Sequence, residues 1–330
     1  MPRDLRQLPK AHLHLHLEGA MRPSTMHDLL SAAGLPAPPR ADGTFATFLS
    51  IYDHASQGLR SPDDIARLVR EVVEDAAADG AVWVEPAEWL KSTAAERAGL
   101  SDVEAVLRVV LEALNEAARQ TGIGTGLMVS TNRLRPTSEA EALARLAARN
   151  AGQGVVSFGL AGDEASGPPE PFSDAFAIAR AAGLLATPHG GELAGPVSVR
   201  GALDTLGARR IQHGVRSVED PALLQRLADE QVCLDVCPTS NVHLRVVPSL
   251  SDHPLPALVH AGIPVSLNAD DPLVFGAGLL AEYELARASF GFDDATLAHI
   301  AACSIRASGA PEELKRTALA GVDAWLDAAE

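Results

Sequence analysis

Short β-rich runs alternate with longer amphipathic patterns along most of this 330-residue chain. Eight of these runs are expected to be strands, and a helical pattern separates each from the next. The predicted strands cover residues 11–17, 82–86, 123–129, 155–160, 184–188, 210–213, 232–237 and 263–268. Eight such repeats in a chain of this length are typical of one (β/α)₈ barrel. We therefore predict an α/β fold with a single barrel domain over residues 1–330.

The helical patterns have recognisable starts and stops. Residues 62–79 carry apolar side chains at the i, i+3, i+4 spacing, with Ser61 as the expected N-cap and Gly80 as the stop. A second helix over 102–121 ends at Gly122. Further helices are expected at residues 138–151, 173–182, 196–206, 219–230, 254–261, 277–290, 293–305 and 311–328.

An open, doubly wound sheet is the alternative fold, but the chain lacks the glycine-rich phosphate loop typical of it. The segment GTG (124–126) has no third glycine in place, and GGE (190–192) has the wrong spacing. Residues 20–60 form a connection longer than usual and contain an apolar patch at 45–55. We expect this insertion to be a helical lid over the C-terminal face of the barrel.

Charge and composition limit the partners that the chain can have. The formal charge is −16, which disfavours nucleic acid and anionic membrane surfaces as partners. The chain has no run of 18 apolar residues, and its first residues lack the apolar stretch of a secretory signal. Cys233, Cys237 and Cys303 form no Cys-x-x-Cys motif, so neither disulfides nor a thiolate zinc site are indicated. We predict a cytoplasmic protein.

Histidines cluster on the first predicted strand, in HLHLEG (14–19). Residues two apart on a strand point the same way, so His14 and His16 share a face that can line the barrel interior. A divalent metal would satisfy both imidazoles at once, whereas surface or hydrogen-bonded histidines are the alternative. His12 shares this face but sits deeper, and we expect it to support the site rather than to bind metal.

Acidic residues and histidines also follow three later strands. His189 and Glu192 follow the fifth predicted strand, His213 ends the sixth, and Asp270 and Asp271 follow the eighth. Barrel enzymes build their active sites at these strand ends. Packing or helix capping would explain any one of these residues but not the whole set. Three imidazoles and one carboxylate suit zinc, with room for a water that the metal makes acidic near neutral pH.

Taken in order, the motifs resemble those of the adenosine deaminase family of metal-dependent amidohydrolases. They extend through nearly the whole chain. The matching segments are PKAHLHLHLEGAMRP (9–23), LAGDE (160–164), HGGE (189–192), QHGVRSVEDP (212–221), CPTSN (237–241) and SLNADDP (266–272). The resemblance implies one zinc ion per chain, a small-molecule purine substrate, and hydrolysis at C6 that releases ammonia.

The resemblance also implies a role for each residue of the site. Glu192 would donate a proton to purine N1, while His213 and Asp271 would position the hydroxide that attacks C6. The main chain at Gly162 would meet the other edge of the purine, and Asp163 and Glu164 would do positioning or structural work. The expected zinc ligands are His14, His16, His189 and Asp270, and the expected contacts to substrate are Glu18, Phe48, Tyr52, Gly162 and Asp271.

The substrate depends on features in which the chain departs from its family. Glu18 stands where adenosine deaminases have an aspartate that binds the ribose 5′ hydroxyl, and adenine deaminases are similar in having Glu there. LAGDE instead resembles the nucleoside branch. Pro86 and Trp89 interrupt the usual Val-Glu-x-Arg-x-x-Pro pattern and Gly190 replaces an alanine, changes that would suit a larger 5′ group. We expect adenosine, with 6-aminodeoxyfutalosine and adenine as alternatives.

Two other classes of function are open. A catalytically silent barrel that binds purines would have no use for the complete set of seven polar residues. Zinc hydrolases of cyclic amides or phosphotriesters commonly use a bridging lysine and two metals. The three lysines are Lys10, Lys91 and Lys315, and none ends the fourth predicted strand. A mononuclear deaminase is therefore favoured, and the sequence does not indicate its oligomeric state.

Overall fold

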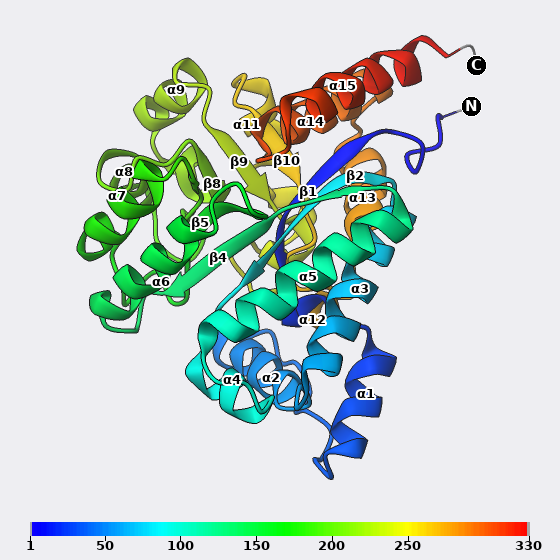
Figure 1. Ribbon diagram of the computed structural model, residues 1–330. Helices are drawn as coiled ribbons and strands as arrows, with labels where there is room; N and C mark the ends of the chain where they lie inside the picture. Colours follow the sequence, from blue (N-terminus) through cyan, green and yellow to red (C-terminus); the bar gives the residue numbers. More distant parts are fainter. Residues whose placement is uncertain (1, 329–330) are drawn as a thin grey trace.

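A computed structural model describes residues 2–328 and forms an α/β barrel of parallel strands (Figure 1). One sheet has the order β1-β2-β4-β5-β6, with β3 beside β2, and the other has the order β10-β9-β8-β7. The strands are β1 (Lys10–His16), β2 (Ala81–Glu88), β3 (Gly124–Thr125), β4 (Leu127–Asn132), β5 (Val155–Ala161), β6 (Leu185–Ala186), β7 (His189–Gly190), β8 (Arg210–His213), β9 (Cys233–Val236) and β10 (Val265–Leu267).

Hydrogen bonds between the sheets close the barrel. The amide of His16 donates to the carbonyl of Asp270 at 3.0 Å, and the amide of Asp270 donates to the carbonyl of His14 at 3.1 Å. These two bonds join β1 to the residues after β10. On the opposite side, only Thr187 and Pro188 separate β6 of one sheet from β7 of the other, and the amide of Gln212 on β8 donates to the carbonyl of Pro188 at 3.0 Å. The predicted barrel is confirmed.

Two of the eight predicted strands are interrupted. β3 and β4 are separated at Gly126, and β6 and β7 are separated at Thr187 and Pro188. Proline has no amide hydrogen to donate, so it breaks a regular ladder. The amide of Thr187 still donates to the carbonyl of Phe158 at 3.0 Å, which keeps the interrupted strand beside β5. Each interrupted pair therefore acts as one barrel strand.

Helices cover the outside of the barrel (Figure 1). Their ends follow the predicted signals: Ser61 Oγ accepts from the amide of Asp64 at 3.1 Å, and Gly122 ends its helix with φ of 79°. The outer helices are α3 (Pro62–Ala78), α5 (Val103–Thr121), α6 (Thr137–Arg149), α7 (Ser173–Ala181), α8 (Pro196–Asp204), α9 (Pro221–Asp229), α11 (Leu255–His260), α13 (Leu279–Phe290), α14 (Asp294–Ala307) and α15 (Glu312–Asp327).

Shorter elements gather at the end where the strands finish. Helices α1, α2, α4 and α12 lie there, whereas α15 and the start of β1 lie at the opposite end (Figure 1). The predicted lid contains α1 and α2, and α2 contacts α12 through the stacked rings of Phe48 and Phe275, whose centres lie 5.5 Å apart. The short elements are η1 (Glu18–Ala20), α1 (Pro23–Ala32), α2 (Phe45–Ser56), α4 (Ser92–Arg97), η2 (Glu170–Phe172), η3 (Val215–Glu219), α10 (Pro238–His243), η4 (Leu250–Asp252) and α12 (Pro272–Phe275).

A buried ion network lies inside the barrel, towards the starts of the strands. Arg210 Nη2 lies 2.7 Å from Glu85 Oε2, and Arg210 Nε lies 3.0 Å from Asp235 Oδ2. Glu85 also accepts from the Trp83 indole at 2.8 Å and from the amide of Gly309 at 2.5 Å. A guanidinium between two carboxyl groups offsets part of the free-energy cost of burying these three side chains.

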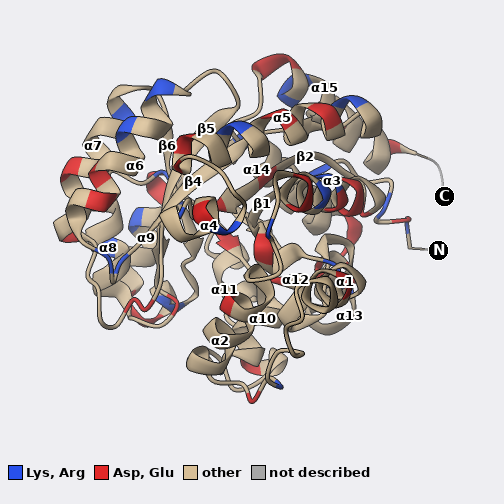
Figure 2. Cartoon of the chain, turned by 60° about the horizontal axis from the view of Figure 1, so that its bottom comes forward, with Lys and Arg blue, Asp and Glu red and all other residues tan. Residues whose placement is uncertain are grey.

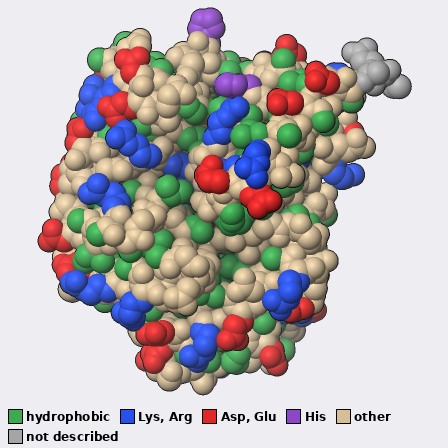
Figure 3. Space-filling model, turned by 45° about the horizontal axis from the view of Figure 1, so that its top comes forward, with side chains coloured by type: hydrophobic (Ala, Val, Ile, Leu, Met, Phe, Trp, Pro, Cys, Tyr) green, Lys and Arg blue, Asp and Glu red, His purple; other side chains and the backbone are tan. Residues whose placement is uncertain are grey.

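Surface charge is distributed over the outer helices. Lys, Arg, Asp and Glu lie mostly on these helices, and few lie on the strands (Figure 2). On the face drawn in Figure 3, acidic and basic side chains are interspersed. No described helix has both the length and the apolar composition needed to cross a membrane.

Candidate metal centre and active site

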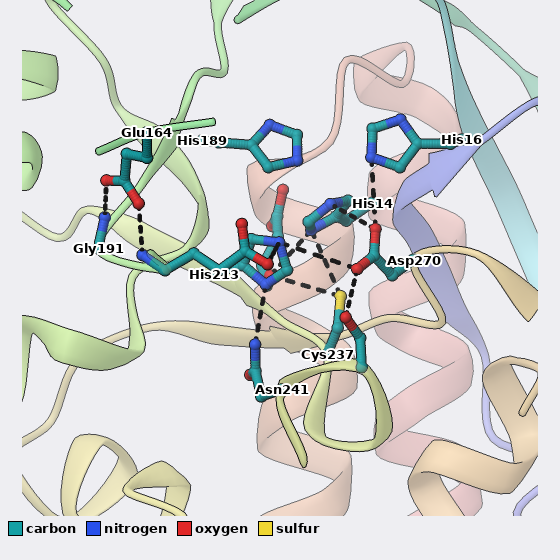
Figure 4. A network of polar contacts seen from close by, with 12 residues as sticks. His14, His16, Glu164, His189, Gly191, His213, Cys237, Asn241 and Asp270 are labelled. Carbon is teal, nitrogen blue, oxygen red and sulfur yellow. Dashed lines mark hydrogen bonds and ion pairs between the residues drawn. The ribbon is translucent and has the colours of Figure 1, made fainter. Parts of the chain in front are cut away.

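Four potential metal ligands converge at the ends of the strands. His14 and His16 come from β1, His189 comes from β7, and Asp270 follows β10. One ligand atom of each lies within 4.8 Å of the others. His14, His189 and Asp270 are buried, and His16 is partly exposed. Figure 4 shows the four side chains around a common centre.

Main-chain carbonyls orient two of the imidazoles. His14 Nδ1 lies 3.2 Å from the carbonyl of Asp235, and His189 Nδ1 lies 3.1 Å from the carbonyl of Leu160. A carbonyl only accepts, so each Nδ1 carries the proton and each Nε2 presents a lone pair. Burial, reinforced by neighbouring histidines, holds the pKa of His189 well below its usual value, so this ring is neutral.

The arrangement fits a cation. The buried Nε2 of His14 has no hydrogen-bond partner and lies 3.2 Å from Asp270 Oδ1. His16 Nε2 lies 3.3 Å from the same oxygen. A lone pair facing a carboxylate oxygen is repulsive unless a positive charge lies between them. Three imidazoles and one carboxylate are the ligand types that zinc accepts.

Asp270 is held as an anion in a strained conformation. Its φ of 62° lies in the left-handed region, as does the φ of 64° at His213, and each such residue costs about 1–3 kcal/mol. Ser240 Oγ donates to Asp270 Oδ2 at 2.6 Å, which leaves Oδ1 facing the imidazoles. Burial opposes the charged form of this carboxyl group, and a cation bound among the neutral imidazoles would favour it.

Cys237 lies beside the metal cluster. Its Sγ is 3.4 Å from His14 Nδ1, and Cys237 forms a second group of possible ligands with His14 and His213. Burial raises the pKa of the Cys237 thiol well above its usual value, so the sulfur stays protonated. A thiol is a poor ligand compared with a thiolate. The thiols of Cys233, Cys237 and Cys303 are all buried and unpaired, in agreement with the absence of predicted disulfides.

Three acid–base groups border the centre. Burial, followed by the charge of Asp270, raises the pKa of Glu192 well above its usual value, which favours the protonated carboxyl group. Burial lowers the pKa of His213 to about 3, which keeps the ring neutral. His213 Nε2 lies 3.5 Å from Glu192 Oε1. Both carboxylate oxygens of Asp271 are buried without a hydrogen-bond partner. The centre is therefore bordered by a carboxyl group with a raised pKa, a neutral imidazole and a carboxyl group without a hydrogen-bond partner.

Glu164 fixes the loop that carries Glu192. Its Oε1 accepts from the amide of Gly191 at 2.5 Å, a contact drawn in Figure 4, and its Oε2 accepts from the amides of Glu192 at 2.9 Å and Ala194 at 3.0 Å. The guanidinium of Arg133 binds the start of the same loop, where it donates to the carbonyl of His189. The sequence motif marked Glu164 for positioning or structural work, and the structure gives it this task. Arg133 carried no sequence signal.

A cavity of about 390 Å³ opens over the centre. Of the residues expected to contact substrate, Phe48, Tyr52, Gly162 and Asp271 line this cavity, and Glu192 and His213 line it as well. The other lining residues are His16, Phe45, Leu49, Asp53, Trp89, Ser130, Thr131, Asn132, Leu134, Arg135, Ala161, His189, Leu244 and Asp270. Aromatic rings from α2 thus form one wall, and the strand ends form the floor.

Glu18 lies outside the cavity lining. Its carboxylate is buried, and its Oε2 accepts from the Tyr52 hydroxyl at 2.5 Å. The next residue, Gly19, has room for no side chain, because a Cβ there would lie 1.6 Å from Asp271 Oδ1. This glycine lets the chain after β1 pass close to Asp271. The Tyr52 hydroxyl separates the Glu18 carboxylate from the space where a substrate would lie.

A side chain at Gly190 would point away from the cavity. A Cβ at this position would meet Ile211 at 3.4 Å and Ala202 at 3.7 Å, which is ordinary van der Waals contact. An alanine would fit there, so the glycine does not enlarge the substrate space. His12, the deeper histidine, accepts from the amide of Ala269 through Nε2 at 3.2 Å. Its ring therefore supports the segment that leads to Asp270.

The comparisons with known proteins agree with this geometry. A profile of the adenosine deaminase family matches residues 9–325. A Streptomyces coelicolor protein named "Putative adenosine/adenine deaminase" is 48% identical, with 98% of each chain covered. The adenine deaminase of Chelativorans sp. is 40% identical, with 93% of this chain and 96% of that protein covered.

Solved structures give the same result. The crystal structure of adenine deaminase from Arthrobacter aurescens has a TM-score of 0.89 and 33% identity, covering 97% of this chain and 99% of that one. A Burkholderia ambifaria amidohydrolase with bound zinc has a TM-score of 0.86 and 28% identity, covering 98% and 93%. Sequence, fold and site geometry agree, and the chain belongs to the adenosine deaminase family of hydrolases that act on C–N bonds.

Proposed function

We propose that the chain holds one zinc ion through His14, His16, His189 and Asp270 and deaminates an adenine ring at C6. The observation that carries this proposal is the lone pair of His14 Nε2, which is buried without a partner and faces the Asp270 carboxylate. A zinc ion would satisfy both groups, and a related amidohydrolase is described with bound zinc.

The chemistry follows from the groups around the cavity. When bound, zinc would supply an acidified water near neutral pH and favour the ionised form of the adjacent Asp271. Glu192 would give its proton to purine N1, which withdraws electrons from C6. Asp271 would take a proton from the attacking water and pass it to the departing amine. The second proton of the water would leave the C6 hydroxyl as the carbonyl forms and would restore the proton of Glu192, so that N1 and the departing amine each gain one proton in the net reaction.

His213 would hold the attacking water in place. Its ring is neutral, and Nε2 points to the space between Glu192 and Asp270. A neutral imidazole that donates from Nε2 can orient the water and stabilise negative charge that develops on the oxygen. The aromatic wall formed by Phe48 and Tyr52 would cover the base and exclude bulk water.

We propose free adenine as the preferred substrate, in place of the adenosine that the sequence analysis favoured. The LAGDE motif was the reason for adenosine, but its Glu164 binds the 191–194 loop and provides no contact for a sugar. Glu18 is capped by Tyr52, which leaves its carboxylate unable to accept a ribose hydroxyl without a rearrangement. The names of the Chelativorans and Arthrobacter relatives support the same choice.

Adenosine is the second candidate, because a cavity of about 390 Å³ has room for more than a purine base. The test is a panel of adenine, adenosine and 6-aminodeoxyfutalosine, assayed by ammonia release with zinc-loaded protein whose metal content is measured. We expect kcat/KM for adenine to exceed that for the two nucleosides by at least about tenfold, which is 1.4 kcal/mol of discrimination. Equal or reversed values would contradict the choice of adenine.

Glu18→Asp is the matched variant for this panel. A shorter carboxylate loses its contact with the Tyr52 hydroxyl and is free to meet a ribose, so the ratio of adenosine to adenine turnover is expected to rise. An unchanged ratio would show that Glu18 does not read the sugar. Full activity in a sample shown to contain no metal would contradict the zinc assignment itself.

A further inference from the structure

A chain of buried hydrogen bonds connects His213 to the main chain behind the site. The amide of Leu255 donates to His253 Nδ1 at 3.1 Å. His253 Nε2 lies 3.2 Å from Asn241 Oδ1, and Asn241 Nδ2 lies 3.2 Å from His213 Nδ1 (Figure 4 shows the last contact). His253, Asn241 and His213 are all nearly inaccessible to solvent.

The direction of every bond in this chain is fixed at its outer end. A backbone amide only donates, so His253 Nδ1 must accept and the single proton of its neutral ring must lie on Nε2. That N–H can be satisfied only by the oxygen of the Asn241 amide, which turns the NH₂ group towards His213. His213 Nδ1 therefore accepts, and its proton lies on Nε2.

The orientation matters because His213 Nε2 faces the reacting groups. It lies 3.5 Å from Glu192 Oε1 and 3.9 Å from Asp270 Oδ2. With the proton on Nε2, the ring donates into the cavity. With the proton on Nδ1, the ring would instead present a lone pair to these oxygen atoms and could not donate to a water between them. The two tautomers thus give opposite polarity at the same position.

We infer that Asn241 and His253 are positioning residues, which hold His213 in the tautomer that donates from Nε2 to the reacting water. This inference rests on the proposed function for its catalytic consequence, but the tautomer is a property of the protein alone. Neither residue touches the cavity, and neither is among the residues lining it. Their effect on turnover passes entirely through His213.

The sharpest test is Asn241→Asp in the zinc-loaded protein. The substitution keeps the size of the side chain and still accepts from His253, but a carboxylate cannot donate to His213. His213 must then carry a proton on Nδ1. Nitrogen-15 NMR of histidine-labelled protein reads this directly, and the His213 signal among the 11 histidines is assigned as the one missing in His213→Asn.

We expect the wild-type spectrum to show His213 protonated on Nε2 only, and the Asn241→Asp spectrum to show a proton on Nδ1. A wrong tautomer in a comparable catalytic histidine lowers kcat about 10⁴-fold, so we expect kcat to fall by about 10³–10⁴ with KM within a few-fold of wild type. Zinc content and the urea midpoint are measured alongside. A wild-type ring protonated on Nδ1, or an unprotonated Nδ1 in Asn241→Asp, would overturn the inference.

His253→Phe is the second variant, and it remains informative if Asn241→Asp does not fold. The new ring keeps the contact with Phe290, whose ring centre lies 5.6 Å from that of His253. Without a donor to its oxygen, Asn241 is free to turn over, so His213 is expected to show both tautomers and kcat to fall about tenfold. A single unchanged tautomer would contradict a role for His253. If the spectra behave as expected but no substrate in the panel reacts, the proposed function fails and the tautomer assignment stands.

Discussion

Replacing Glu164 with Gln tests how the loop bearing the general acid is held. The carboxylate accepts three amide hydrogens, one at Oε1 from Gly191 and two at Oε2 from Glu192 and Ala194. The amide of glutamine has a single oxygen. Placed at the Oε2 position it keeps two acceptor contacts, but its NH₂ group then faces the amide of Gly191, donor against donor.

The magnitude follows from these contacts. A hydrogen bond to a charged acceptor contributes about 1.5–3 kcal/mol, and a buried donor left without a partner costs about 1–3 kcal/mol. One hydrogen bond is lost, and the acceptor in the other two becomes neutral. Glu164→Gln should therefore lower the free energy of unfolding by about 3 kcal/mol. A shift of about 1 Å in a catalytic group can cost 10²-fold in rate, so kcat should fall by about this factor.

Urea unfolding, analysed with the same m-value for variant and wild type, measures the change in the free energy of unfolding, and ammonia release measures kcat. The control is Asp163→Asn, whose carboxylate accepts from the amide of Ala165 at 3.0 Å and from Ser166 Oγ at 2.6 Å in an exposed turn. The control should lose less than about 1 kcal/mol and keep its kcat, because the Asp163 carboxylate bonds to Ala165 and Ser166 of its own turn, and the substitution leaves the three contacts of Glu164 in place. A Glu164→Gln protein within 1 kcal/mol of wild type would refute this explanation of the loop.

Three further changes have definite expected outcomes. Glu192→Gln should keep zinc and fold but lower kcat by about 10²–10⁴, since it cannot donate the proton to N1; metal analysis and ammonia release check this. Ser240→Ala removes the hydroxyl bound to Asp270 and should weaken zinc affinity about 10–100-fold in a chelator competition. Burial raises the pKa of Glu282 to about 7, so the stability from its neutral form is present below pH 4.5 and is lost as the pH rises through 7. Glu282→Gln should therefore gain about 3 kcal/mol over wild type at pH 8 and nothing at pH 4 in urea titrations.

The barrel could be predicted because its signals are local. Apolar spacing, the Ser61 cap and the glycine stops depend on residues a few positions apart, and these signals place the major helices to within a few residues. The short helices α4, α10 and α12 were missed, because four to six residues show little helical period, although α11 is as short and lies within the helix predicted at 254–261. Their positions depend on the loops that they close.

The convergence of the four potential metal ligands could be anticipated, because in a barrel the ends of all strands meet at one face. The hydrogen-bond partners of the other site residues could not be predicted from the sequence. Tyr52 reaches Glu18 across 34 residues, and the bond exists only because α2 folds down over the cavity. His253 follows no strand and carries no motif of its own, so its link to Asn241 depends on how the loop after α10 packs. Tertiary packing alone decides such pairs.

The left-handed backbone at His213 and Asp270 has a consequence for engineering. A campaign for heat resistance that ranks positions by unfavourable dihedral angles would place these two near the head of its list and suggest glycine. Glycine would relax the chain and delete the imidazole or the carboxylate at the same time. Gains in heat resistance must therefore come from the outer shell of helices, while the rim of the barrel keeps its unfavourable geometry.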